Sequence, residues 1–281
     1  MRFMPPNDLS RLVMLGGCAG GEMVLEIKEE IRRRLAEIEA KEDVRILYAC
    51  ESGSRAWGFA SRDSDWDVRF IYAHRNDWYL SIDVEKKRDV IELPISDDLD
   101  VNGWDVRKAL WLYRKSNPPL LEWIDSPIVY QKRTNFIDRL RMLLADYYTP
   151  KTCHYHYISM AKKNYREYLR GENVRLKKYL YVLRPLLAVR WMEQEKCPAP
   201  VEFSKLLKCI ELYDAKKEIE KLVERKINGD ELDHGKRIDI INQFIESELV
   251  RMDSLVPNGP LHADVGPLNR LFRETLVEVW S

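Results

Sequence analysis

Two aspartates, Asp65 and Asp67, open a β-prone stretch that continues through Val68 to Tyr72. Residues two apart share one face of a strand, so we expect both carboxylates to point the same way. Like charges held this close resist joint ionisation, and a divalent cation removes the conflict. Carboxylate oxygens suit Mg²⁺, which is also bound by substrate phosphates. The spacing therefore predicts a metal-assisted site.

A small-residue turn, Ser52-Gly53-Ser54, precedes the aspartates by about ten residues and follows an apolar run from Val44 to Ala49 that predicts a strand. Glycine lets the backbone approach an anion closely, and a helix starting after the turn adds its positive end. A phosphate-binding turn beside paired acids is the equipment of metal-assisted phosphoryl or nucleotidyl transfer. Either half alone carries little information, whereas the order strand, turn, strand makes the combination specific.

A two-metal site needs a third acid from a neighbouring strand. Asp100 lies in a predicted short strand and is our choice, and Glu92, in another apolar strand, is its main rival. Asp98 has the same parity as Asp100 but falls in a turn. Asp105 is better explained as the cap of a helix that starts at Gly103 or at Asp105 itself.

The pattern of Gly-Ser, Asp-x-Asp and an apolar strand resembles the active-site signature of the DNA polymerase β-type nucleotidyltransferase superfamily. Four longer blocks resemble predicted nucleotidyltransferases of the RlaP type, which are associated with RNA repair. The resemblance extends over roughly residues 23 to 210, and it too places an acid at Asp100. The blocks are 45–61, 64–72, 99–110 and 181–188.

The resulting hypothesis is a Mg²⁺-dependent nucleotidyltransferase that moves a nucleoside monophosphate from a nucleoside triphosphate to a hydroxyl, with two Mg²⁺ ions. An RNA 3′ end would make it a terminal transferase, and a small-molecule or protein hydroxyl is the alternative acceptor. A non-catalytic interaction module is a second class, which the intact motif argues against. The predicted metal ligands and catalytic residues are Asp65, Asp67 and Asp100. The predicted nucleotide-binding residues are Gly53, Ser54, Arg55, Arg69, Lys162, Lys178 and Arg184.

One stretch of the chain, 151–191, is strongly basic, with ten basic and two acidic side chains. A triphosphate and three aspartates carry more negative charge than two Mg²⁺ ions neutralise, so we expect this stretch to form one wall of the cleft. A solvated helix face is the alternative for any single lysine. Arg55 and Arg69, near the motif, equally suit phosphates or a neighbouring acid. Those expected to face Asp65 and Asp67 are several of Lys162, Lys163, Lys177, Lys178 and Arg184.

Composition narrows the function classes. The 281 residues carry zero net charge, which argues against a generic nucleic-acid binder, and no apolar stretch approaches the ~20 residues of a membrane span. The five cysteines are odd in number and scattered, which suits a reducing cytoplasm and argues against disulfides or a zinc site. Cys153, His154 and His156 are too divergent along a helix to predict a metal site.

The chain order predicts an α+β protein: an N-terminal nucleotidyltransferase-type mixed sheet with flanking helices, followed by a C-terminal helical bundle. We assign residues 1–22 to a loosely ordered leader, 23–130 to the α/β domain and 131–281 to a helical substrate- or nucleotide-binding domain. Beyond the motif, a strand is expected over 90–95 and a short one over 99–101, and none after about 130. The expected helices span 24–40, 103 or 105–115, 120–124, 136–147, 153–170, 174–195, 203–210, 213–227, 231–252 and 266–279.

Overall fold

The structure is a computed structural model that describes residues 18–96, 98–229, 232–255 and 264–281. The chain divides into two compact units, Met1–Asp43 and Val44–Ser281. The described part of the first unit is helix α1 (Cys18–Glu42) and Asp43, and the helix begins six residues before the predicted start at 24. Gly20 and Gly21 each cost a helix only about 1 kcal/mol, and extension of a formed helix adds a hydrogen bond per residue. The remainder of the predicted leader, 1–17, lies outside the described residues.

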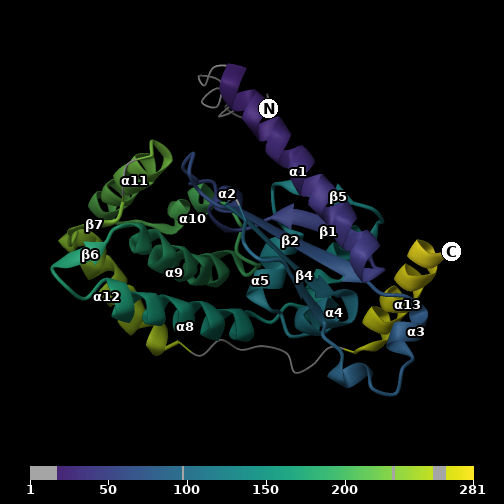
Figure 1. Ribbon diagram of the computed structural model, residues 1–281. Helices are drawn as coiled ribbons and strands as arrows, with labels where there is room; N and C mark the ends of the chain where they lie inside the picture. The colour runs from purple at the N-terminus through teal and green to yellow at the C-terminus, as the bar shows by residue number, and fades with distance from the viewer. Residues whose placement is uncertain (1–17, 97, 230–231, 256–263) are drawn as a thin grey trace, which may run out of the picture. The chain divides into compact units, whose positions relative to one another are not determined.

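The second unit is built around a sheet that has five strands within the described residues, in the order β3-β4-β2-β1-β5 (Figure 1). Strands β2 and β4 run parallel and the other neighbours antiparallel, so the sheet is mixed as expected. The interior strand β1, between β2 and β5, is almost entirely buried, which explains its continuous apolar run. The strands are β1 (Arg45–Glu51), β2 (Trp66–Ala73), β3 (Val90–Glu92), β4 (Leu99–Asp105) and β5 (Val129–Lys132).

Strand β4 is longer than predicted, and the reason lies on its neighbour β2. Gly103 pairs with Phe70, whose ring covers it so closely that a Cβ on the glycine would lie 2.1 Å from the ring. The glycine is therefore a packing site inside a strand and does not begin a helix. The next helix is capped by Asp105, whose side chain accepts from Arg107 N, so the alternative start at Asp105 is the right one. Strand β3 is shorter than predicted and ends at Glu92, before Pro94.

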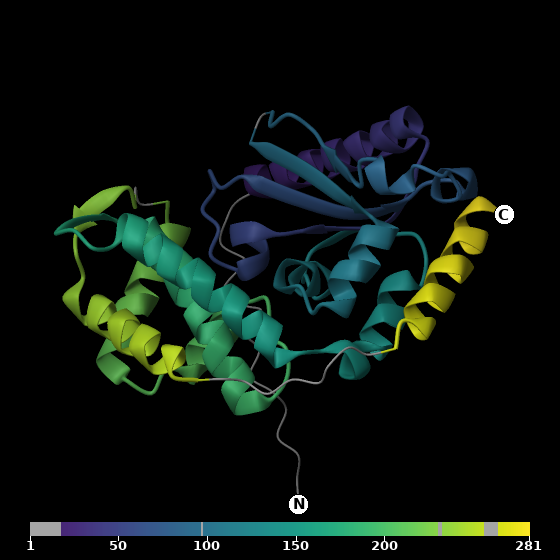
Figure 2. The ribbon, with the colours of Figure 1, turned by 90° about the horizontal axis from the view of Figure 1, so that it is seen from below.

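The sheet-side helices enclose one hydrophobic core with the strands. The last helix, α13, also belongs to this core. Although it lies at the C-terminal end of the chain, it packs on α4 and α6 (Figure 2). The predicted helix over 136–147 is broken into two at Leu143. The helices that contribute to this core are α3 (Asn76–Tyr79), α4 (Val106–Arg114), α5 (Pro118–Ile124), α6 (Phe136–Met142), α7 (Leu144–Tyr147) and α13 (Gly266–Trp280). Helix α2 (Gly53–Trp57) and the 3₁₀ turn η2 (Val84–Lys86) complete the elements between the strands.

The largely helical region has a second core, centred on the adjacent helices α8 and α9 (Figure 1). None of the described helices is long and apolar enough to span a membrane. The elements of this region are α8 (Pro150–Tyr168), β6 (Asn173–Arg175), α9 (Lys177–Glu195), α10 (Phe203–Leu206), 3₁₀ turn η3 (Leu207–Cys209), α11 (Tyr213–Ile227), β7 (His234–Lys236) and α12 (Asp239–Asp253).

Strands β6 and β7 correct the prediction that no strand follows residue 130, as does β5, which ends at Lys132. The pair joins segments 60 residues apart in sequence, with Val174 opposite Gly235. Strands of three residues leave no periodic signal in the sequence, so the helices predicted over 174–195 and 231–252 overlap β6 and β7. They begin instead at Lys177 and Asp239, while the predicted start at Glu231 lies outside the described residues. The domain boundary near 130 remains a prediction.

Asp105 provides a pH test of this packing. The carboxyl is 1% exposed and accepts from Arg107 N–H and Tyr79 O–H, and burial raises its pKa to about 6. The unfolded chain loses this proton near pH ~3.9, so between the two values the folded state binds more protons and its stability falls as pH rises. We expect the unfolding free energy of the wild type to fall by about 2–3 kcal/mol relative to Asp105→Asn between pH 4 and 7. Urea titrations that give parallel pH profiles for the two proteins would contradict the buried, protonated carboxyl.

Candidate active site

The Gly-Ser turn lies directly against Asp67. Strand β1 ends at Glu51, and Ser52 N donates to the Asp67 backbone oxygen at 2.8 Å. Gly53 then takes a φ of +59°, and a Cβ at this position would fall 2.0 Å from Asp67 Oδ2. Both the left-handed backbone and the close approach require glycine here. The two halves of the sequence motif are thus in van der Waals contact.

Asp67 and Asp100 face each other across strands β2 and β4, where they are register partners. Arg69, two residues after Asp67 on the same face, bridges them. Its Nη2 lies 3.0 Å from Asp67 Oδ1 and 2.7 Å from Asp100 Oδ2. Of the two alternatives for Arg69, the structure shows pairing with acids.

The three predicted acids are electrostatically coupled. Burial raises the pKa of Asp67, Arg69 opposes the shift, and the charges of Asp100 and Asp65 raise the pKa further. Asp65 itself is exposed immediately before β2. Repulsion of this kind is what a bound cation relieves.

Glu92, the rival third acid, lies elsewhere on the sheet. Its exposed carboxylate pairs with Arg88 and accepts from Asn102 Nδ2 at 3.0 Å. Asp100 is therefore the acid that stands beside Asp67, while its role as a metal ligand remains a prediction. Arg55, predicted to bind nucleotide, donates from Nε to the Asp65 backbone oxygen at 3.2 Å and stacks on Trp66 at 3.7 Å. It fixes the loop that leads into the acids.

The predicted basic residues of the helices divide into paired and unpaired. Lys162 pairs with Asp253, and buried Arg184 pairs with Glu122 at 2.8 Å.

Lys178 is partly buried over the rings of Tyr168 and Tyr181, at 4.5 and 4.9 Å. Burial and the charges of Lys177 and Arg175 lower the pKa of Lys178. Lys177 lies 3.9 Å from Asp233, and Lys163 is exposed.

Sequence reasoning missed Lys226, which reaches the motif from α11. Its Nζ donates to Ser61 Oγ at 2.8 Å, in the loop before Asp65. Burial and the charge of Lys177 lower the pKa of Lys226, whereas Asp63 and Asp65 raise it. Lys226 lies 165 residues after Ser61, on an ordinary amphipathic helix, so no local signal marks it.

Glu51 is the second residue that sequence reasoning missed. It is fully buried, accepts from Asp67 N at 2.8 Å and accepts from the Tyr130 hydroxyl. Burial raises the pKa of its carboxyl to about 7. An acid at the end of a buried strand, next to the Gly-Ser turn, was the available signal. The carboxyl holds the backbone of Asp67 in place.

A cavity of about 330 Å³ opens beside these acids, between strands β2 and β4 and helices α5, α8 and α9. Its lining combines four aromatic rings with polar groups from the sheet side and from the helical region of the second unit. Its lining residues are Ser52, Trp57, Arg69, Asn102, Trp104, Pro119, Glu122, Trp123, His156, Met160, Tyr181, Arg184 and Pro185.

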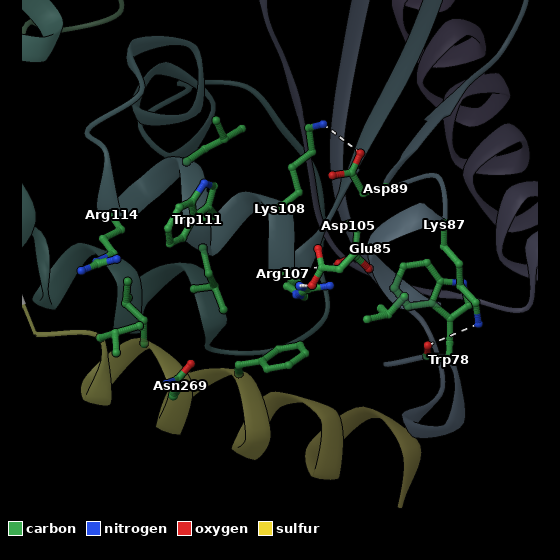
Figure 3. A pocket seen from close by; sticks show the side chains of 16 residues that line it. Trp78, Glu85, Lys87, Asp89, Asp105, Arg107, Lys108, Trp111, Arg114 and Asn269 are labelled. Atoms are coloured by element: carbon green, nitrogen blue, oxygen red, sulfur yellow. Dashed lines mark hydrogen bonds and ion pairs between the residues drawn. The ribbon is translucent and has the colours of Figure 1, made fainter. Parts of the chain in front are cut away.

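A larger pocket of about 540 Å³ lies away from the motif, between α4, α13 and the connection from β2 to β3 (Figure 3). Two of its cations are paired: Lys108 lies 2.9 Å from Asp89, and Arg107 contacts Glu85. None of its lining residues belongs to the motif.

The donor set suits Mg²⁺ in its chemistry, because coupled carboxylates on one sheet edge are hard oxygen ligands. Within the described part of the chain, however, no three His, Cys, Asp or Glu side chains converge tightly enough to form a metal cluster. Arg69 provides the positive charge between Asp67 and Asp100. The three acids supply oxygen ligands of the right kind, and Arg69 balances the charge of Asp67 and Asp100.

A mixed sheet that sets a Gly-Ser turn against paired aspartates defines this chain as nucleotidyltransferase-like. Residues 27–274 match the model of RlaP, the RNA repair pathway DNA polymerase beta family. The chain therefore belongs to the RlaP family, as the sequence blocks predicted. It is also 48% identical over 258 residues to the uncharacterized protein YcgL of Bacillus subtilis (strain 168), covering 91% of this chain and 98% of that one.

A nucleotidyltransferase-like protein from Exiguobacterium sibiricum 255-15, known from a crystal structure, also matches this chain. The match covers 90% of this chain and 80% of that one, with 14% sequence identity and a TM-score of 0.32. A likeness this low carries no argument about function.

Gly53, the first residue of α2, and Gly58, its C-cap, separate backbone strain from the contact with Asp67. Gly53 and Gly58 both have positive φ, +59° and +84°, but a Cβ on Gly58 meets nothing within 4 Å. Alanine at either position carries left-handed strain of about 1–2 kcal/mol. We expect Gly53→Ala to cost about 1–3 kcal/mol more than Gly58→Ala in urea unfolding, because only its methyl overlaps Asp67. Equal losses in the two variants would show that the turn does not press on the carboxylate.

Proposed function

We propose that this protein is a Mg²⁺-dependent nucleotidyltransferase that transfers a nucleoside monophosphate from a nucleoside triphosphate to the 3′-hydroxyl of RNA. One observation carries the proposal: the approach of Gly53 to Asp67, where a Cβ would lie 2.0 Å from the carboxylate. A turn that can receive phosphate oxygens thus adjoins acids that can receive a cation. The RNA acceptor is supported by the family's RNA repair pathway.

The turn and two lysines are proposed to hold the triphosphate. Gly53 and Ser54 offer backbone N–H groups, Lys226 of α11 donates to Ser61 in the loop before Asp65, and Lys178 of α9 lies over the Tyr181 ring. Burial, followed by the positive charge of Lys177, lowers the pKa of both lysines, and a polyanion would relieve their repulsion with Lys177. Lys162 and Arg184 already pair with acids, so the proposed phosphate contacts do not include them.

Asp65, Asp67 and Asp100 are proposed to hold Mg²⁺. Two bound ions would lower the pKa of the attacking hydroxyl and stabilise the leaving pyrophosphate. Arg69 is a positioning residue that keeps Asp67 and Asp100 facing each other. The Glu51 carboxylate accepts a hydrogen bond from Asp67 N and so fixes the Asp67 backbone.

The test uses labelled nucleoside triphosphates, Mg²⁺ and an RNA with a free 3′-hydroxyl. We expect Asp67→Asn and Asp100→Asn each to lower the rate of label transfer by at least about 100-fold, because loss of a metal ligand removes several kcal/mol of transition-state stabilisation. Mn²⁺ binding, followed by electron paramagnetic resonance, should weaken in the same variants. Urea unfolding checks that both remain folded.

Glu92→Gln is the matched control, since Glu92 is the other candidate acid but lies exposed beside Arg88. It should retain activity and Mn²⁺ binding. Full activity in Asp67→Asn, or loss of activity in Glu92→Gln, would contradict the assigned acids. Equal transfer to RNA whose 3′ end is blocked by phosphate would redirect the acceptor to another hydroxyl. Absence of transfer to every acceptor would favour the interaction module.

A further inference from the structure

Four aromatic side chains form part of the wall of the 330 Å³ cavity and can cover the flat face of a ligand. Trp104 and Trp123 stack with ring centroids 3.8 Å apart, and Trp57 meets Tyr181 edge-on at 5.6 Å. All four rings line the cavity. Aromatic faces of this kind hold planar rings by stacking, with little regard to their substituents. The walls therefore favour a planar ligand.

The charges of the cavity are already neutralised inside the protein. Arg69 pairs with Asp67 and Asp100, and Arg184 pairs with Glu122. The cations proposed to hold phosphate, Lys178 and Lys226, do not line the cavity. The ligand part that enters the cavity is therefore uncharged.

Two buried nitrogens of the lining lack hydrogen-bond partners among the described residues: Arg184 Nε and His156 Nε2. Arg184 is 3% exposed, and its terminal nitrogens reach Glu122 and the Val201 carbonyl oxygen. Burial lowers the pKa of His156, so its imidazole is neutral at pH 7. A buried polar group without a partner costs stability, and its persistence calls for a ligand that satisfies it. The ligand thus needs polar atoms around its rim.

The cavity opens toward the acids. Ser52, at the start of the Gly-Ser turn, and Arg69, between the acids, belong to its lining. Burial raises the pKa of Tyr181, and the charges of Asp67 and Asp65 raise it further, so this ring lies within their field. A ligand that occupies the cavity can extend its other end to the turn.

We propose that this cavity binds a nucleobase, stacked among the tryptophans and recognised by Arg184 Nε and His156 Nε2. A planar, uncharged ring with hydrogen-bonding edges meets all three requirements. The volume lies at the low end of small-molecule sites, which suits one base and its sugar and not a strand. The assignment rests on the proposed function for the identity of the base, which belongs either to the triphosphate or to the RNA end.

The test measures binding of adenosine, guanosine, cytidine and uridine by calorimetry, without metal or triphosphate. At least one nucleoside should bind the wild type, and His156→Leu should weaken it by about tenfold or more, because a buried hydrogen bond is lost. The same variant should unfold at an equal or higher urea concentration, since it removes an unpartnered nitrogen. Met160→Trp should also weaken binding, as Met160 lines the cavity and is 38% exposed.

His154→Leu is the matched control. His154 lies on the same helix and is 2% exposed, and its Nε2 also lacks a partner among the described residues, but it does not line the cavity. It should change stability as His156→Leu does and leave nucleoside binding unchanged. Equal weakening by both variants would overturn the proposal, as would unchanged binding in His156→Leu.

Two further measurements distinguish failure of the nucleobase assignment from failure of the proposed function. A trinucleotide with a 3′-hydroxyl that binds in a His156-dependent way, while nucleosides do not, assigns the cavity to the RNA end. Failure of both probes to bind overturns the nucleobase assignment. Nucleoside binding that depends on His156 stands even where no transfer occurs. Conversely, Asp67-dependent transfer with an unchanged KM in His156→Leu overturns the inference and leaves the proposed function intact.

Discussion

The pairing of Arg69 with Asp67 and Asp100 is the contact on which the geometry of this site depends. Parallel pairing of β2 with β4 sets the two carboxylates side by side, and their repulsion would otherwise splay the strands or protonate one acid. Arg69 shares the strand face of Asp67 and reaches both oxygens. All three side chains are partly exposed, so the pairing contributes little net stability. Its effect is to balance the charge of two acids that the strand pairing sets side by side.

Near Arg69 and its two acids, the protein buries charged side chains whose burial is not required for the stability of the fold. Glu51 lies fully buried under Asp67, and the Arg184–Glu122 pair is almost fully enclosed beside the cavity. Desolvation of such groups offsets much of their attraction, and apolar residues of similar volume often serve a core equally well. Both border the motif or the cavity, so local departures from good packing mark the functional region. The pKa of Glu51, raised to about 7, expresses the same cost.

The sequence predicted the motif strands and the neighbouring acid Asp100 because both depend on local patterns: alternation, β-prone residues and a glycine turn. What it could not predict depends on contacts between distant segments. Gly103 reads as a helix start until Phe70 covers it, and β6 and β7 are too short to leave a periodic pattern. Lys226 reaches the motif through a helix packing that no spacing encodes. The pairing of Arg184 with Glu122 is equally hidden from the sequence, because the two residues lie 62 positions apart.

The contacts between the two halves of the second unit decide how its cavity behaves. Lys226 fastens α11 to the loop before Asp65, and Arg184 and Tyr157 both bond Glu122 on α5. The helical region is therefore joined to the sheet on either side of the acids, and the cavity between them is formed before any ligand arrives. A preformed site avoids the cost of ordering loops and side chains on binding. The same contacts restrict the cavity to a ligand that fits its existing shape, so discrimination depends on the polar groups of its lining and not on closure around the substrate.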